Sequence, residues 1–116
     1  MEPVTLVDAE NVRRSQWPNI EPAELVRLVR GWAEVTGSHA LVVFDGPPPD
    51  VVSDRIVKVV GTKRESADDR IVRDAERLAR AGRPYRLVTS DRGLRERVRA
   101  LGASIEGAGA LLERLD

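Results

Sequence analysis

Segments of strand length that are rich in apolar residues alternate along this chain with stretches in which apolar residues recur at helical spacing. This alternation is typical of repeated β-α units, in which parallel strands form a central sheet and helices cover both of its faces. The strands are predicted at 4–8, 40–45, 55–60, 85–89 and 103–105. The sequence therefore predicts an α/β fold, a three-layer α/β/α sandwich with a central, mainly parallel sheet of about five strands.

Local signals place the helices and one edge of the sheet. Pro22 suits the first position of a helix and Gly37 suits its end. The strand at 55–60 alternates polar and apolar residues better than the others, so it is predicted at a sheet edge, whereas 11–20 is predicted to be a polar loop. The helices are predicted at 22–37, at 67–81, after Asp91, and as a final turn or two after 107–109.

Size and composition restrict the class of protein. With 116 residues, the chain is predicted to form a single domain over 1–116. It has no cysteine, which excludes thiolate nucleophiles and cysteine-based zinc sites, and no apolar run approaches the roughly 20 residues that cross a bilayer. Basic and acidic residues number 19 each, so any nucleic-acid contact must be local. We expect a protein that does not enter membranes and, by default, a cytoplasmic one.

Three predicted strands run out into an aspartate, namely Asp8, Asp45 and Asp91. Because the carboxyl ends of parallel strands lie at the same edge of a sheet, these carboxylates are predicted to share one rim. Neighbouring strands are about 4.8 Å apart, so the charges would repel unless a cation or a shared proton relieved them. Each aspartate alone is also explained as a cap of backbone N–H groups, and for Asp91 that explanation is the better one. Because an aspartate recurs at the ends of three strands, a shared cation-binding site is favoured over three separate caps.

The helix predicted at 67–81 supplies a fourth carboxylate. Asp68 shares a helical face with Ile71 and Ala75, so it is predicted to point toward the sheet. Asp69 follows Ser66 at the spacing of a capping box and is predicted to cap the helix. Asp68 is therefore the predicted member of the site.

The chemistry of these residues favours a hard metal ion. Carboxylates without cysteine suit Mg²⁺ or Mn²⁺, which we predict as the cofactor. His39, the only histidine, lies at the opposite end of its predicted strand and is predicted to be a surface or loop-packing residue. A metal-bound water of lowered pKa can attack phosphorus without a histidine base. The cluster therefore predicts metal-dependent cleavage of a nucleic-acid phosphodiester.

Four short motifs stand at these positions, namely LVDAENV at 6–12, VFD at 43–45, ESAD at 65–68 and TSDR at 89–92. Together they resemble the YacP-like NYN domains, a branch of the PIN-like nuclease superfamily, over nearly the whole chain. The resemblance implies a PIN-like three-layer fold, a metal-dependent ribonuclease activity at the acidic cluster, and RNA as the partner.

The resemblance also implies roles for single residues. The aspartates that match metal-binding or further acidic positions of the family, and that are predicted to be catalytic, are Asp8, Asp68, Asp91 and Asp45, the first three as metal ligands. Asn11 completes a D-x-x-N motif and is predicted to orient a ligand or to touch phosphate; a plain turn residue explains it equally well. Glu65 and Ser90 lie inside the motifs and are predicted to support the site.

Two departures from the family pattern affect the expected substrate contacts. Relatives commonly have Asp-Gly-Tyr-Asn where this chain has Asp8-Ala9-Glu10-Asn11, so Glu10 adds a negative charge and a tyrosine is missing. Many relatives also carry a further basic segment after the last helix, which would help to bind RNA or a ribonucleoprotein. A ribonucleoprotein partner is therefore a weaker expectation than RNA itself.

Basic residues flank the predicted rim in three places. Those predicted to bind substrate phosphates are Arg13, Arg14, Lys63, Arg64 and Arg92. The alternative is that such arginines keep the surface soluble and pair with nearby acids, which is the better explanation for Arg95. Trp17 is predicted to cover an edge of the core rather than to stack on a base, and Trp32 to lie in the core.

Two other functions fit the same pattern. A module that keeps the fold but binds RNA without cutting it is favoured by Glu10 alone. A phosphatase or phosphoacceptor domain shares the strand-end aspartate but needs a nearby lysine, and Lys58 and Lys63 lie in and just after the predicted edge strand. A metal-dependent endoribonuclease is the leading prediction.

Overall fold

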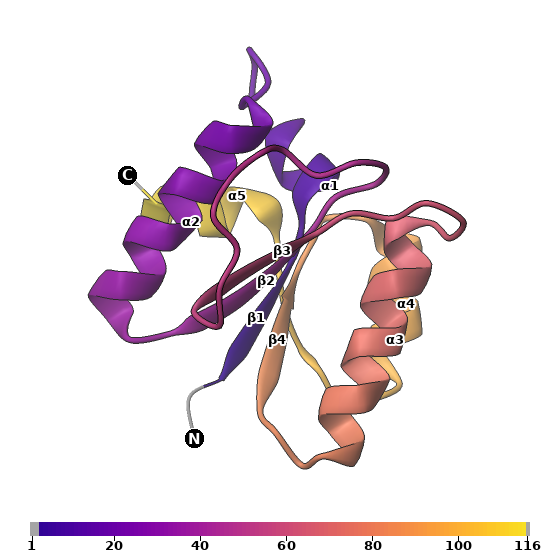
Figure 1. Ribbon diagram of the computed structural model, residues 1–116. Coiled ribbons are helices and arrows are strands. Elements are labelled where there is room, and N and C mark those ends of the chain that lie inside the picture. The colour runs from indigo at the N-terminus through magenta and orange to yellow at the C-terminus, as the bar shows by residue number, and fades with distance from the viewer. Residues whose placement is uncertain (1–2, 116) are drawn as a thin grey trace.

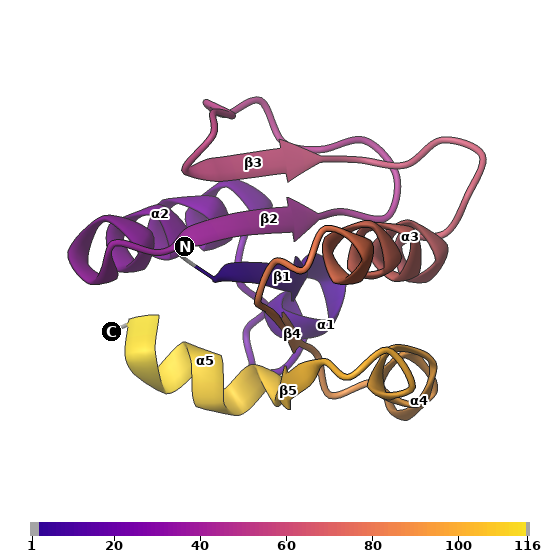
Figure 2. The ribbon, with the colours of Figure 1, turned by 90° about the horizontal axis from the view of Figure 1, so that it is seen from below.

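The computed structural model describes residues 3–115. Its five strands form one sheet in the order β3-β2-β1-β4-β5, and every neighbouring pair is parallel (Figures 1 and 2). The strands are β1 (Val4–Asp8), β2 (His39–Val43), β3 (Val57–Val60), β4 (Tyr85–Val88) and β5 (Ser104–Glu106). The predicted parallel sheet is confirmed.

Helices cover both faces of this sheet. In Figure 1, α2 and α5 lie on one side of the strands and α3 and α4 lie on the other, while the short α1 follows directly from β1. The helices are α1 (Ala9–Arg13), α2 (Pro22–Thr36), α3 (Ala67–Arg80), α4 (Arg92–Arg99) and α5 (Ala108–Leu115). The predicted three-layer α/β/α sandwich is therefore confirmed.

The two faces of the sheet bury separate hydrophobic cores. Successive side chains of a strand point to opposite faces, so Leu6 packs in a cluster with Ile71 of α3, whereas Val7 packs in a cluster with Leu25 of α2. All five residues of β1 are buried. The central strand is thus covered on both sides, which explains why its sequence shows no alternation of polar and apolar residues.

Part of the predicted loop at 11–20 is helical, so that prediction was wrong for its first residues. Ala9–Arg13 form α1, in which Val12 is fully buried. Glu10 lies in the first turn and Arg13 in the last, where their charges complement the helix dipole. The acidic residue at 10 and the basic residue at 13 were the local signal for this helix.

Several predicted boundaries differ by one to three residues from the observed ones. The strand predicted at 40–45 is observed at His39–Val43. The amide of Phe44 still donates to the carbonyl of Val60 (2.9 Å), and Asp45 lies beyond this last bond. The last strand is shifted from 103–105 to Ser104–Glu106, and the last helix already begins at Ala108. Leu101 falls outside α4 but packs against the same core.

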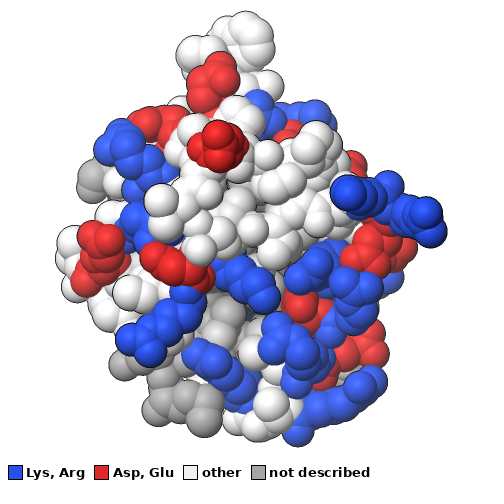
Figure 3. Space-filling model, in the orientation of Figure 1, with Lys and Arg blue, Asp and Glu red and all other residues white. Residues whose placement is uncertain are grey.

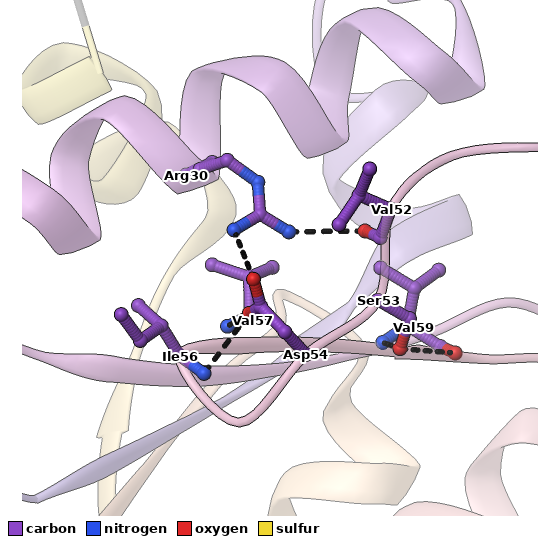
Figure 4. Close-up of polar contacts among 7 residues, drawn as sticks. All are labelled: Arg30, Val52, Ser53, Asp54, Ile56, Val57 and Val59. Atoms are coloured by element: carbon purple, nitrogen blue, oxygen red, sulfur yellow. Dashed lines mark hydrogen bonds and ion pairs between the residues drawn. The ribbon is translucent and has the colours of Figure 1, made fainter.

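The predicted edge strand at 55–60 is confirmed at the edge, but it begins only at Val57. The residues before it turn back on the strand, because the Asp54 carboxylate accepts from the amides of Ile56 and Val57 (both 3.0 Å). The Ser53 hydroxyl pairs with the amide (2.9 Å) and carbonyl (3.4 Å) of Val59 (Figure 4). Ser53 thereby occupies part of the open edge of β3, which blunts strand-to-strand association there.

Arg30 of α2 fastens this segment to the helix layer. Its guanidinium donates to the Asp54 carboxylate (3.0 Å) and to the carbonyl of Val52 (3.0 Å), as Figure 4 shows.

Within residues 3–115, no helix is both long enough and apolar enough to cross a membrane.

The strand order changes direction between β1 and β4. The chain proceeds from β1 through β2 to β3 on one side, and then returns to place β4 and β5 on the other. In open parallel sheets, ligands bind outside the carboxyl ends of the strands at this reversal. The carboxyl ends of β1 and β4 are therefore the place at which to look for a site.

Candidate active site

Three polar residues at the ends of strands, namely Asp8, Asp45 and Thr89, lie on the same face of the sheet. Asp8 follows Leu6 at a spacing of two, and Asp45 and Thr89 stand in the same relation to Val43 and Leu87. Leu6, Val43 and Leu87 all pack in the cluster beneath α3 and α4. The strand period of two therefore directs all three polar side chains toward the beginnings of these two helices.

A cleft of about 340 Å³ opens at this point. Its lining comes from the ends of β1 and β2, from α1, and from the starts of α3 and α4. The lining residues are Asp8, Glu10, Asn11, Arg14, Asp45, Ser66, Ala67, Asp68 and Asp91. The structure thus brings together the four aspartates that the sequence singled out.

Asp8 is the most deeply placed of these carboxylates, with 5% of its surface exposed. The hydroxyl of Thr89 donates to its Oδ2 (2.8 Å). Burial raises the pKa of Asp8 to about 6; the bond from Thr89 lowers it, and the charges of Asp68 and Asp91 raise it further. Ionisation of Asp8 at neutral pH therefore lowers the stability of the folded protein.

Asp68 and Asp69 point in different directions from the first turn of α3. Asp68 lines the cleft, and its pKa is raised first by burial and then by the charge of Asp91. The Ser66 hydroxyl caps the amide of Asp69 (3.0 Å), as predicted, but the Asp69 carboxylate instead pairs with Arg97 of α4 (2.9 Å). The prediction that Asp69 itself caps the helix was therefore wrong.

Asp91 and Asp45 each have a structural partner as well as a place in the cleft. Asp91 is the N-cap of α4, where its Oδ1 accepts from the amide of Leu94 (2.9 Å). Asp45 is exposed and accepts from the hydroxyl of Thr62 (3.3 Å). The alternative explanation of Asp91 as a cap is thus correct, and the cap also holds its carboxylate at the cleft.

Asn11 joins the first motif to the last. Its Oδ1 accepts from the amide of Ser90 (2.8 Å), and the Ser90 hydroxyl accepts in turn from the amide of Ala108 at the start of α5 (3.1 Å). The oxygen of the Asn11 amide group is therefore occupied, which leaves the NH₂ group as the donor available to a ligand in the cleft. Ser90 supports the site through the backbone, as a link between α1 and α5.

Thr89 is the site residue that sequence reasoning quoted in a motif but left without a role. It is fully buried, its hydroxyl donates to Asp8, and its Oγ1 accepts from the amide of Asp91 (3.1 Å). One side chain therefore contacts the carboxylate of Asp8 and the backbone of Asp91. The available signal was a hydroxyl at the end of an otherwise apolar strand, directly before the motif aspartate.

The first two predicted phosphate ligands lie in different environments. Arg13 donates to the carbonyl of Ile20 (2.7 Å) and to the carboxylate of Glu10 (2.6 Å), and its side chain is only 16% exposed. Arg14 is 69% exposed, lines the cleft and contacts Glu10 at 3.4 Å. Arg14 is thus placed to meet a substrate, whereas Arg13 is committed to internal contacts.

Lys63 and Arg64 line a neighbouring cleft rather than the acidic one. That second cleft lies at the loop between β3 and α3, where Glu65 pairs with Arg73 of α3 (2.7 Å). Figure 3 shows Lys and Arg side chains gathered over the region of this loop and of α3. Arg92 is exposed at the first position of α4, next to Asp91. Basic residues therefore border the acidic cleft without lining most of it.

The two tryptophans differ from their predicted positions. Trp17 does not cover the core, since 89% of its surface is exposed. Trp32 lies at the periphery of the core rather than inside it, and the guanidinium of Arg114 stands 5.9 Å from its ring centre. His39 is half-buried at the start of β2 and contacts Arg83 at 3.2 Å, far from the acidic cleft as predicted.

The donor set can be tested against the predicted ion. Carboxylates are the hard oxygen ligands that Mg²⁺ and Mn²⁺ prefer, and the pKa of Asp8 is raised in part by the charge of Asp68. In the described part of the chain, no three acidic or histidine side chains converge closely enough to ligate an ion directly. Mg²⁺ commonly binds through one or two carboxylates and keeps several waters, so Asp8 and Asp68 fit it as a pair.

Replacing Thr89 with valine is expected to shift the pH dependence of any activity that needs charged Asp8. The Thr89 hydroxyl favours the charged carboxylate, so its loss raises the pKa of Asp8 further above its present value of about 6. A hydrogen bond to a charged group contributes about 1.5–3 kcal/mol, so activity just below neutral pH is expected to fall roughly tenfold. Thr62→Val, which removes the contact to exposed Asp45, is the control; an unshifted rate–pH profile for Thr89→Val would contradict the prediction.

Comparison with known proteins agrees with this fold. The sequence pattern of the YacP-like NYN domain family matches residues 8–116. The crystal structure of Rae1 (YacP) from Bacillus subtilis superposes with a TM-score of 0.79 at 25% identity, over 99% of this chain and 74% of that chain. A mutant of the same protein gives 0.74 at 26% identity, over 97% and 74%. A comparison with curated proteins gives no match.

An acidic cleft at the strand reversal of a parallel α/β sheet, with basic residues at its border, defines a nuclease-like domain. The fold is that of the Rae1 structures. The chain belongs to the YacP-like NYN domain family, whose members are nuclease-like domains related to RNA.

Proposed function

We propose that this protein is a metal-dependent ribonuclease that cleaves RNA phosphodiesters within a strand. The observation that supports this most directly is the convergence of Asp8, Asp68 and Asp91 on one cleft, in which the pKa values of Asp8 and Asp68 are raised by burial and by neighbouring negative charge. Such unrelieved repulsion between carboxylates is the condition that a bound cation relieves.

Each residue of the cleft has a role in this proposal. Asp8 and Asp68 would hold Mg²⁺ or Mn²⁺ directly, and Asp91, held in place by its cap to α4, would contact one of the waters that the ion keeps. When bound there, such an ion would lower the pKa of a water and neutralise charge that develops on the phosphate. Thr89 fixes the orientation of Asp8, and Asp45, which is exposed, acts from the substrate side.

The surroundings of the cleft support an RNA strand as the substrate. Arg14 lines the cleft and Arg92 lies at its border, so both can contact phosphates next to the scissile bond. Lys63 and Arg64 extend this basic border toward α3. Because Asp45, Asp91 and Arg14 are exposed, the cleft is open to a strand that lies across it, which supports internal cleavage. A ribonucleoprotein substrate and a cytoplasmic location remain predictions of the sequence.

Cleavage of labelled RNA by variants at Asp68 and at the adjacent Asp69 tests this function. We expect cleavage with Mn²⁺ or Mg²⁺, no cleavage after EDTA, and cleavage of a circular RNA, which has no ends. Asp68→Asn is expected to reduce the rate by more than about 100-fold, because even groups that only support metal ligands contribute 10–100-fold.

Asp69→Asn is the matched control for this experiment. Its carboxylate pairs with Arg97 on the outer side of the helix, so the rate is expected to stay within about twofold of the unmodified protein. Cleavage that persists in EDTA, or equal rates for the two variants, would falsify the proposal.

One observation favours a second function, that of an RNA-binding module without activity. Glu10 lines the cleft and adds a fifth carboxylate to it. Its charge is largely met by Arg13 (2.6 Å) and Arg14 (3.4 Å), which weakens this alternative. RNA binding without turnover at any concentration of Mg²⁺ or Mn²⁺ would establish it.

A further inference from the structure

The most exposed large apolar side chain in the described residues is Trp17, at 89%. Of the other three aromatic residues, Phe44 is buried and Trp32 and Tyr85 are partly buried against the two cores. An indole has a large apolar surface that is stabilised when it is covered. Nothing in the described part of the chain covers Trp17, so its indole is available to a ligand.

The loop that carries Trp17 is fixed at its base. The amide of Ile20 donates to the carbonyl of Arg13 (3.1 Å), and the Arg13 side chain donates back to the carbonyl of Ile20 (2.7 Å). Ser15 bonds to the carbonyl of Val12 through both its amide (3.2 Å) and its hydroxyl (2.6 Å). Ile20 is itself buried. Residues 14–19 therefore project from a rigid attachment, which Figure 1 shows as the loop that rises between α1 and α2.

This attachment keeps the indole within a short distance of the acidic cleft. The loop leaves α1, which begins directly after Asp8. Arg14 lines the cleft and precedes Trp17 by three residues, so the two Cα atoms are at most about 10–11 Å apart. That span corresponds to roughly three base steps of a helical strand at 3.4 Å per step. A nucleotide near the scissile phosphate is thus within reach of the ring.

The charges of the cleft explain why a contact of this kind is needed. Five carboxylates line the cleft against one guanidinium, so phosphates that approach it are repelled unless other contacts offset the repulsion. Base–aromatic stacking draws on no net charge, and it accepts every base because each has a π face. In a duplex the inner base faces are already stacked on their neighbours. The indole therefore selects unpaired nucleotides.

We propose that Trp17 is a stacking platform for an unpaired base of the substrate, which makes single-stranded RNA the substrate class of this site. The inference rests on the proposed ribonuclease function and adds a residue outside the cleft that determines specificity. Arg14, which lines the cleft and precedes Trp17 by three residues, contacts the backbone phosphate of the same segment.

Intrinsic fluorescence tests the stacking directly. In a Trp32→Phe background Trp17 is the only tryptophan, so its emission reports on its own surroundings. A short single-stranded RNA is titrated in EDTA, which prevents turnover. We expect the RNA to quench the emission of Trp17, and the duplex of the same sequence to quench it weakly and to bind less tightly.

Substitution then measures the contribution of the ring. Trp17→Ala is expected to weaken binding of the single strand by roughly 5- to 150-fold, the range that corresponds to one stacked base. Trp17→Phe is expected to retain most of the affinity. Val35→Ala is the control, because Val35 is also exposed (87%) but lies near the end of α2.

The outcomes separate this inference from the proposed activity. Binding that depends on Trp17, in a protein that does not cut RNA with Mg²⁺ or Mn²⁺, would overturn the activity and keep the stacking contact. Cleavage with the same KM in Trp17→Ala and the unmodified protein would overturn the stacking contact alone. So would equal affinity for single strand and duplex, or a Trp17→Ala variant that binds RNA normally but changes the oligomeric state, which would identify a protein contact instead.

Discussion

Replacing Asp8 with asparagine is expected to reduce the rate of RNA cleavage by more than about 100-fold. Even groups that only orient metal ligands contribute 10–100-fold to activity. Asp8 lies deepest in the cleft, and its carboxylate is oriented by Thr89 at 2.8 Å. Asparagine has nearly the same shape and can still accept the bond from Thr89, but it carries no charge with which to hold a cation. Labelled RNA with Mn²⁺ or Mg²⁺ provides the measurement.

The same substitution is expected to stabilise the metal-free protein at neutral pH. Burial raises the pKa of Asp8 from 3.8 to about 6, so over this range the folded protein keeps a proton that the unfolded chain has released. The free energy of unfolding therefore falls as the pH rises through this window, by roughly 3 kcal/mol for a rise of this size in the pKa. The asparagine side chain does not ionise, so the Asp8→Asn variant avoids this cost.

Urea unfolding in EDTA, at about pH 4 and about pH 7, measures this effect as the difference between the two proteins. The variant is expected to gain stability relative to the unmodified protein only at the higher pH. Asp69→Asn, which removes a carboxylate at an exposed position, is the control. If the difference in stability between Asp8→Asn and the unmodified protein were the same at both pH values, ionisation of Asp8 would not destabilise the folded protein. If Asp8→Asn lost activity because it misfolds, it would be less stable than the unmodified protein at both pH values.

Changing Gly61 to alanine is expected to destabilise the protein by about 3 kcal/mol, at the upper end of the cost of overpacking. A Cβ atom at Gly61 would lie well inside the contact distance of the Gly46 carbonyl oxygen and 2.9 Å from the nitrogen of Pro48. Both are backbone atoms, which cannot rotate away. The Gly46 carbonyl also accepts from the amide of Thr62 (2.9 Å), so the whole crossing of these two loops must shift.

Gly31→Ala is the matched control, with the opposite expected sign. Gly31 lies within α2, and a Cβ atom there meets nothing within 4 Å. Alanine at an open helical position is expected to stabilise the protein by about 0.5–1 kcal/mol. Urea unfolding of both variants provides the test. If Gly61→Ala were as stable as the unmodified protein, the close approach of the two loops would be wrong.

The edge of the sheet that carries the site could be predicted from the sequence, but the face could not. Strand-end aspartates on parallel strands must share an edge, which identified Asp8, Asp45 and Asp91. The face depends on which residues of β1 lie beneath α3, and all five are buried, so their sequence carries no alternation from which to read it. For Asp68, helical spacing was sufficient, because the helix has one buried stripe.

Contacts between distant segments explain what sequence reasoning missed. Asp69 pairs with Arg97, 28 positions away, rather than with its own helix end, and no local pattern indicates that choice. Trp17 was expected to cover the core because it is apolar, yet the bonds between Arg13 and Ile20 hold its loop away from the core. Local spacing predicts how one element begins and ends, whereas these side chains depend on which elements meet.

The bond between Asp8 and Thr89 joins positions that are 81 residues apart in the chain. The strand that carries Asp8 is synthesised before β4 and the start of α4, which complete its central place in the sheet. Closing so long a loop is slow compared with forming local helices. A chain that has been synthesised only as far as α3 therefore has no assembled cleft. The proposed cleavage of RNA requires β4 and the start of α4 as much as it requires β1.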